Sequence, residues 1–252
     1  MSRATTLLFA IACYAIFFAT FLYLVVFVGD LSFSSQTVDV GPESPAATAA
    51  IIDFALIALF RLQHSVMARP AFKARWTKVV PPPAERSVYV LAASIALMIL
   101  MFGWRPIDTI VWNVGNPLLS QIIWLLFWAG WGVVLLSTFL INHFELFGLQ
   151  QAWFHALGHQ AEAPQFRQPM LYKWVRHPLY LGFFLAFWAA PEMTAGHFLL
   201  ALGVSAYMLI AIRYEERDLT DLFGDDYRRY REDVGMLTPR FRRRRAPDLP
   251  AA

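Results

Sequence analysis

The sequence predicts an all-α membrane protein: a polytopic transmembrane helix bundle of four spans, followed by a C-terminal transmembrane helical hairpin and a cytoplasmic amphipathic helix. Apolar residues make up 58% of the 252 residues, which leaves little polar surface for a soluble protein. Four stretches have the roughly 20 apolar residues that cross a hydrocarbon core. Charged residues gather near the C-terminus, where positions 213–252 hold ten of the 21 basic and nine of the 18 acidic residues.

The four spans are expected at about 6–28, 47–67, 87–104 and 118–141. Arg3 precedes the first span, as a basic residue does in a signal peptide. The apolar run that follows is longer than the ~7–15 residues of such a peptide, so the span is expected to be retained. The triplet Pro81–Pro83 predicts a stiff loop before the third span.

The fifth apolar region, 179–212, is too long for one span. It is interrupted by turn-forming and helix-breaking residues, namely Pro191, Glu192, Thr194 and Gly196. This pattern predicts a tight helical hairpin whose first arm is short. After Arg213, apolar residues recur at steps of three and four, which indicates an amphipathic helix with Gly224 as a candidate break.

The charge of the loops predicts how the chain is oriented. Loop 29–47 has no Lys or Arg, and the loop after the third span has only Arg105, whereas loops 68–86 and 143–178 and the C-terminal region are basic. Basic loops are retained on the cytoplasmic side. The two kinds of loop alternate if both termini face the cytoplasm and the chain makes six passes, counting both hairpin arms.

The charge also narrows the range of partners. The net charge is only +3, and most C-terminal arginines alternate with Asp and Glu, so no nucleic-acid partner is expected. The run Arg242–Arg245 is instead expected to meet anionic lipid headgroups. The single cysteine, Cys13, excludes a disulfide framework and a cysteine zinc site. His155 and His159 have the spacing of metal ligands but lack a third one, so no metal site is predicted.

Polar residues gather at five helix ends on the predicted cytoplasmic side. They are His64 and Ser65; Glu85 and Arg86; Asn142, His143 and Glu145; Arg176, His177 and Tyr180; and Arg213, Glu215 and Glu216. Snorkelling or interfacial anchoring explains any one of these charges. The whole set at one membrane depth indicates a site between helices.

The most specific local pattern is Tyr-Lys-Trp-Val-Arg-His-Pro-Leu-Tyr-Leu-Gly at 172–182. Pro178 suits the first turn of a helix, so His177 would stand at the helix start beside free backbone donors. With Arg176, this makes a candidate anion site for a small carboxylate. The alternative is a proline-initiated membrane helix with a basic flank.

A second pattern is Arg213-Tyr-Glu215-Glu216, followed by Phe-Gly and spaced tyrosines. Two adjacent carboxylates at an interface can bind a cation or accept hydrogen bonds from sugar hydroxyls. The alternative is a solvated helix face on which neighbouring arginines offset the acidic pair.

Together these patterns resemble the membrane methyltransferases that include isoprenylcysteine carboxyl methyltransferase and bacterial phospholipid N-methyltransferases. The resemblance rests on Arg-His-Pro-x-Tyr-x-Gly, the hairpin, and the Glu-Glu pair, and covers about 170–240. Segments 63–70, 85–89 and 142–150 resemble one branch, the bacterial methanethiol S-methyltransferases. The resemblance then spans most of the chain from about residue 60 onward.

The resemblance implies one integral membrane domain, 1–252, in a bacterial inner membrane, with an S-adenosylmethionine site within about 142–240. It implies that the cofactor is lined by Tyr172, Arg176, His177, Pro178, Leu179 and Tyr180. Glu215, with Glu216, would close over it, and S-adenosylhomocysteine would be the product. One departure is Ala211, where the isoprenylcysteine enzymes carry an arginine. A carboxylate substrate is therefore less favoured, although Arg213 could substitute.

The expected reaction is methylation of a small thiol, most simply methanethiol to dimethyl sulfide. A thiol with a pKa near or above ~8.5 is mostly protonated at pH 7, so a site must remove or screen one proton. His64 is the first candidate base, with His143 and Glu145 as alternatives.

Asp53 and Arg61 lie in the same span as His64. Each would cost ~2.5–3.5 kcal/mol in lipid, so both are expected to face protein.

Two other classes of function remain open at this point. An enzyme of the same fold could methylate a lipid headgroup or an isoprenylcysteine carboxylate, provided that its helices part to admit a bulky substrate. A non-enzymatic membrane protein of the nurim type resembles the chain around Gln63–Ser65. Such a protein would not need the paired motifs at 172–182 and 213–216.

Overall fold

The four predicted spans are helices in the computed structural model, which describes residues 2–159 and 166–240. They are α1 (Arg3–Val28), α2 (Ala46–Ala68), α4 (Pro82–Gly103) and α5 (Pro117–Ile141). The predicted start of the third span was five residues late. Pro82 and Pro83 belong to the first turn of α4 rather than to a stiff loop, because the first turn does not need their missing N–H groups. The run Arg242–Arg245 lies outside the described residues.

The predicted hairpin is also present. Its arms are α8 (Pro178–Trp188) and α9 (Ala195–Phe223), and the amphipathic helix α10 (Asp225–Asp233) follows. The 11 residues of α8 extend only about 16 Å, roughly half of a hydrocarbon core, so the first arm is short, as predicted. Gly224, with a positive φ of 58°, separates α9 from α10.

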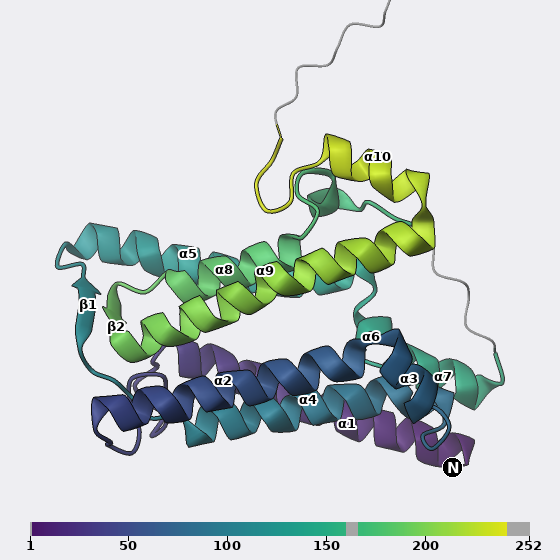
Figure 1. Ribbon diagram of the computed structural model, residues 1–252, viewed down its shortest axis with the longest axis horizontal. Helices are drawn as coiled ribbons and strands as arrows, with labels where there is room; N and C mark the ends of the chain where they lie inside the picture. The colour runs from purple at the N-terminus through teal and green to yellow at the C-terminus, as the bar shows by residue number, and fades with distance from the viewer. Residues whose placement is uncertain (1, 160–165, 241–252) are drawn as a thin grey trace, which may run out of the picture.

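A two-stranded antiparallel ribbon joins the two halves of the chain at one end of the bundle. Strand β1 (Ile110–Asn113) pairs with β2 (Glu192–Thr194), so the turn between the hairpin arms is bound to the loop between α4 and α5 (Figure 1). The all-α prediction did not include this ribbon. Of the residues that predicted the turn, Glu192 and Thr194 belong to β2, and Thr194 then caps α9 by accepting a hydrogen bond from the His197 N–H.

The opposite end of the bundle carries short elements that the sequence did not predict. Helices α3 (Pro70–Trp76), α6 (His143–Leu146) and α7 (Leu149–Leu157) lie there near the N-terminus of the chain (Figure 1). A 3₁₀ turn, η1 (Met170–Lys173), precedes α8. These elements occupy the loops that were predicted to be cytoplasmic.

The long helices form two layers around a common apolar core. Helices α1, α2 and α4 make one layer, and α5, α8 and α9 make the other (Figure 1). The backbones of α5 and α8 approach closely through small residues. A methyl group added at Gly182 would lie 2.7 Å from the carbonyl oxygen of Gly130. This is the small-residue packing expected between membrane helices.

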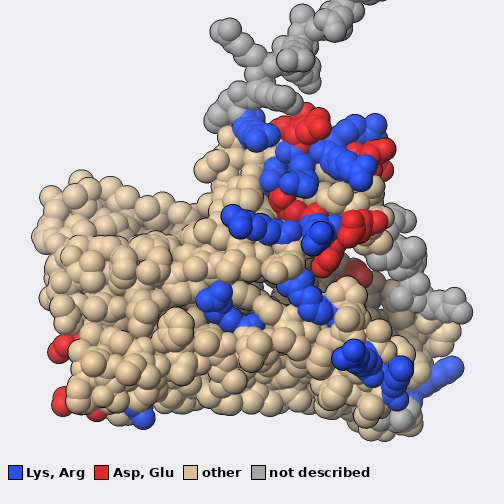
Figure 2. Space-filling view, viewed as in Figure 1, with Lys and Arg blue, Asp and Glu red and all other residues tan. Residues whose placement is uncertain are grey.

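The outer surface of the bundle suits lipid rather than water. Large apolar side chains are exposed along the helices, for example Leu8 (68%), Ile51 (71%) and Leu125 (69%). Within the residues that the structure describes, five helices are long and apolar enough to span a bilayer: α1, α2, α4, α5 and α9. Most Lys and Arg side chains lie toward the end that carries α3 and α10 (Figure 2). The protein is therefore an integral membrane protein whose charge is concentrated near one surface.

Candidate functional site

The segment before α8 is held in place by the segment that follows α10. The Arg176 N–H donates to the Gly235 carbonyl at 2.8 Å, and the His177 N–H donates to the Met236 carbonyl at 3.1 Å. Val175 and Gly235 form a parallel bridge. Residues 234–236, which we name the strap, thus occupy the two backbone donors that the sequence predicted to be free beside His177.

Glu216 joins the two predicted motifs directly. Its carboxylate accepts hydrogen bonds from Arg176 Nε at 2.8 Å and is 3.2 Å from His177 Nε2. Arg231 of α10 adds an ion pair at 3.2 Å. Only 7% of Glu216 is exposed. The structure therefore confirms that the loop before residue 178 and the acidic pair after residue 212 meet at one place.

All three guanidinium nitrogens of Arg176 contact protein acceptors. Besides Glu216, its Nη1 donates to the Arg231 carbonyl at 3.0 Å and to the Val234 carbonyl. A two-pronged hydrogen bond to a ligand carboxylate, as predicted from the sequence, would require one of these bonds to break. In this geometry Arg176 instead fixes the strap and the start of α8 relative to α9.

Glu215 is the carboxylate with free acceptor capacity. Its side chain is 45% exposed, and its Oε2 lies 3.9 Å from His177 Nδ1. Tyr180 of α8 and Tyr172 of η1 both interact with it. Burial and the neighbouring Glu215 charge raise the pKa of Tyr172, so its hydroxyl stays protonated at neutral pH and can donate a hydrogen bond.

A small aromatic core supports this region from α10. Tyr227, Tyr230 and Val234 pack with Phe166 and Phe223. The Tyr230 hydroxyl donates to the carbonyl of Tyr172 at 2.6 Å, and burial raises the pKa of Tyr230 to about 12. The spaced tyrosines of the sequence therefore dock α10 against η1 and do not form a solvated face.

His64 lies in a second polar group, between the two layers of helices. Its ring is hydrogen-bonded to the Tyr89 hydroxyl of α4, 2.9 Å from Nε2, and meets the Tyr207 ring of α9 edge-on. Ser65 donates to the Tyr207 hydroxyl at 3.4 Å. Tyr180 connects this group to the first one, because it interacts with Glu215, Tyr207 and Tyr89.

The two alternative bases are placed differently. His143 is buried, and its ring nitrogens are each 2.8 Å from a hydroxyl, those of Tyr14 and Thr138. Burial lowers the pKa of His143, so it stays neutral as a link between α1 and α5. Glu145 is exposed and bonded to Asn142 at the start of α6. Neither geometry favours a role in removing a proton from a substrate.

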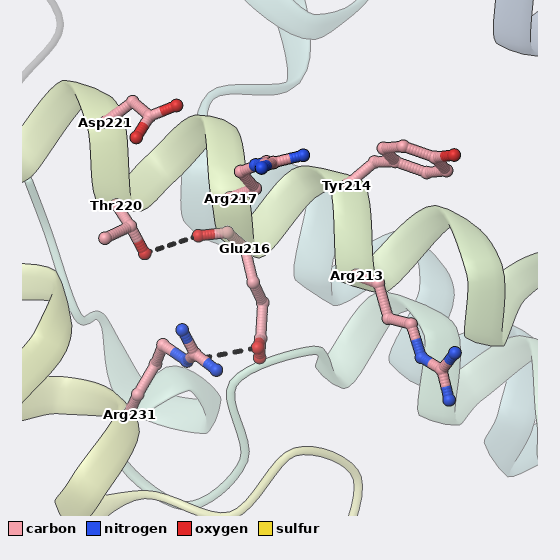
Figure 3. Close-up of a pocket in the computed structure, with 7 residues that line it drawn as sticks. All are labelled: Arg213, Tyr214, Glu216, Arg217, Thr220, Asp221 and Arg231. Atoms are coloured by element: carbon pink, nitrogen blue, oxygen red, sulfur yellow. Dashed lines mark hydrogen bonds and ion pairs between the residues drawn. The ribbon is translucent and has the colours of Figure 1, made fainter.

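An open cleft of about 410 Å³ lies on the outer side of Glu216. It is lined by Arg213, Tyr214, Glu216, Arg217, Thr220, Asp221 and Arg231 (Figure 3). Figure 3 shows Glu216 extending from α9 toward Arg231. Of the sequence-predicted cofactor residues, only Glu216 belongs to this lining. Arg213, the predicted substitute for a missing arginine, is an exposed residue of this cleft.

Sequence reasoning missed Arg231, Tyr207 and the strap. Arg231 lies among the charges of α10 and carries no motif of its own. Tyr207 lies in the apolar second arm of the hairpin, where a tyrosine is ordinary. Gly235 was the one available signal, because a glycine after an amphipathic helix indicates a turn. An added methyl group at Gly235 would overlap the Thr238 carbonyl at 1.9 Å.

The chain is similar in sequence to several known proteins. The family model described as "NnrU protein" matches residues 54–240. Methanethiol S-methyltransferase 1 of Bradyrhizobium diazoefficiens is 52% identical over 232 residues, 92% of this chain and 81% of that protein. Methanethiol S-methyltransferase of Mycobacterium tuberculosis is 47% identical over 239 residues, 95% and 98% of the two chains. Nurim of Xenopus laevis is 31% identical over 180 residues, 66% and 61%. No solved structure gave a significant match.

Proposed function

Because the chain belongs to the NnrU family and to the methanethiol S-methyltransferases, we propose that it methylates methanethiol to dimethyl sulfide with S-adenosylmethionine as the methyl donor. The observation that carries the proposal is the meeting of the 172–180 and 215–216 segments at Glu216. Near 50% identity over almost the whole chain supports the choice of thiol. Nurim matches less of the chain and at lower identity.

The residues around Glu215 fit the chemistry of this donor. Glu215 has spare acceptor capacity for hydroxyl groups, and Tyr172 and Tyr180 offer aromatic faces that attract a cation. His177 and Pro178 start α8 beside them, and Leu179 follows in the same turn. When bound, S-adenosylmethionine supplies an electrophilic methyl group on a sulfonium. We assign Arg176 and Glu216 a structural role, because their ion pair holds the start of α8 against α9.

His64 is the group to which we assign the thiol proton. It lies among hydroxyl groups inside the bundle, whereas His143 and Glu145 are committed to structural hydrogen bonds. Removing the proton yields the thiolate, which is the nucleophilic form. Holding the thiolate sulfur in line with the methyl group would contribute a large part of the rate.

The loop charges support an orientation in which this site faces the cytoplasm of a bacterial inner membrane, with the aliphatic thiol arriving from water or from the bilayer. The same site on a lipid-methylating enzyme would need an opening wide enough for a headgroup.

The proposal is tested with the purified protein in nanodiscs. The protein is incubated with methanethiol and S-adenosylmethionine, and dimethyl sulfide is measured by gas chromatography. We expect turnover in the native protein and a loss of at least tenfold in Glu215→Ala. Native protein that forms no dimethyl sulfide, or that instead methylates the nanodisc lipids, would overturn the assignment.

A further inference from the structure

Two Arg–Tyr pairs flank His64. The guanidinium of Arg86 lies 5.1 Å from the centre of the Tyr89 ring, and Tyr89 is the tyrosine hydrogen-bonded to His64. The guanidinium of Arg61 lies 5.4 Å from the centre of the Tyr207 ring, and Tyr207 is the tyrosine that meets His64 edge-on. Cations are thus held near His64 from both α2 and α4.

Neither arginine has a carboxylate partner in the described residues. The ion pairs found in 2–159 and 166–240 involve other cations, and Arg86 Nε instead donates to the Leu146 carbonyl at 2.7 Å. Asp53, the acid within the span that contains Arg61, accepts a hydrogen bond from the backbone N–H of Arg105 at 2.9 Å.

Arg61 and Arg86 are both partly buried against apolar helices, where a cation without a counter-ion is costly. The acidic groups that face this region are Glu85, which acts on Tyr89, and Glu215, which acts on Tyr180. In the described part of the chain, neither carboxylate forms an ion pair of 4.0 Å or less with Arg61 or Arg86. The arrangement therefore has unsatisfied positive charge beside a candidate base.

We propose that Arg61 and Arg86 form an anion site around His64 that binds the methyl acceptor as its thiolate. This inference rests on the proposed function and names the form of the substrate that the site selects. The thiol proton passes to His64, and a sulfur lone pair forms the new carbon–sulfur bond. The bond between the methyl group and the donor sulfonium breaks, leaving a neutral thioether and the neutral donor sulfide. His64 then returns its proton to water.

Such a site selects acceptors by acidity. Small thiols and hydrogen sulfide can enter as anions, whereas amines and alcohols of similar size remain neutral or cationic at pH 7. Tyr89 and Tyr207 are positioning residues in this scheme, because they hold the two guanidinium groups and do not react.

The test is the pH profile of kcat at saturating methanethiol in Arg61→Met and Arg61→Lys, because kcat reports the pKa values of groups in the enzyme–substrate complex. Removing one cation should raise the apparent pKa of the bound thiol by about one unit, so kcat falls about tenfold at pH 7 and recovers toward the native value above about pH 9. Arg61→Lys keeps the charge and should retain the native profile. A uniform loss at every pH, or no change in Arg61→Met, would overturn the proposal.

Arg69 provides the matched control. Its guanidinium lies 3.9 Å from the centre of the Tyr214 ring, so it also joins α2's C-terminal end to α9, and it reaches the His64 group only through its charge acting on Tyr207. Arg69→Met should therefore shift the profile less than Arg61→Met does. Should Arg61→Met fail to accumulate, thiocyanate is used as a probe anion on the native protein. Competition with methanethiol supports the anion site, and non-competitive inhibition or none at 50-fold excess over methanethiol contradicts it.

The proposed function and this inference fail in distinguishable ways. Absence of dimethyl sulfide in the native protein removes the function itself. Native turnover with an unshifted Arg61→Met profile leaves the function in place and removes only the anion site.

Discussion

Glu216→Gln removes the charge on which the junction of α8, α9 and α10 depends. Glu216 and Arg176 are each only 9% exposed at the side chain, and Arg231 adds a second cation. Breaking a buried pair leaves an uncompensated charge, which costs about 3–5 kcal/mol. Because that cost falls on the docked strap, local opening should become about 10²–10⁴ times more frequent.

Hydrogen exchange measures this opening at the backbone amides of Arg176 and His177, which donate to the strap. The matched control is Asp225→Asn, which breaks the 2.7 Å ion pair with Arg228 on the exposed side of α10. An exposed pair contributes about 0–1 kcal/mol, so exchange should hardly change. Equal exchange in the two variants, or unchanged exchange in Glu216→Gln, would refute the reasoning.

Two further predictions concern packing and pH. Gly182→Leu should destabilise the protein by about 3 kcal/mol or more, because even a Cβ there meets the Gly130 carbonyl. The control is Gly132→Leu, which should be neutral because no atom lies within 4 Å of its added Cβ. Thermal unfolding in detergent compares them, and similar midpoints would contradict the close α5–α8 contact. Burial raises the pKa of Asp39 to about 6, above its unfolded value near 3.8, so the folded state holds the proton more tightly and stability falls as pH rises from about 4 through 6. Asp39→Asn should therefore gain about 1–3 kcal/mol at pH 7 and lose this pH dependence, while the exposed Asp108→Asn should not; a destabilised Asp39→Asn would show that the charge itself is needed.

The helices could be predicted because length and apolar composition decide them locally. The short first arm and the break at Gly224 followed from single residues whose backbone preferences are strong. The ribbon could not be predicted, since Ile110 and Thr194 pair across more than 80 positions, β1 does not alternate apolar and polar residues, and the three residues of β2 are too few to show a pattern. Its pairing depends on where the helix ends already lie.

The candidate site was predictable in its residues but not in its connections. The sequence indicated that His177 and Glu216 belong to one place, and the structure brings them to 3.2 Å. It could not indicate that Arg176 is used internally, because that depends on the carbonyls of Arg231 and Val234. It ranked His64 before His143 but could not show what contacts their rings, which is where the two residues differ in the structure.

The site therefore has two parts with different tasks. The Glu216 junction fixes the walls near Glu215, and the hydroxyl-rich group around His64 lies between the layers. Tyr180 interacts with residues of both parts. In our proposal the first part would hold the methyl donor and the second would hold the acceptor.

Binding of S-adenosylmethionine to the purified protein, measured by isothermal titration calorimetry, tests the central claim most directly. The account predicts one equivalent bound per chain. Affinity should be at least about tenfold lower in Glu215→Gln, since a hydrogen bond to a charged group contributes about 1.5–3 kcal/mol. Asp221→Asn, on the outer cleft, should keep the native affinity. No binding by the native protein, or a loss confined to Asp221→Asn, would contradict it.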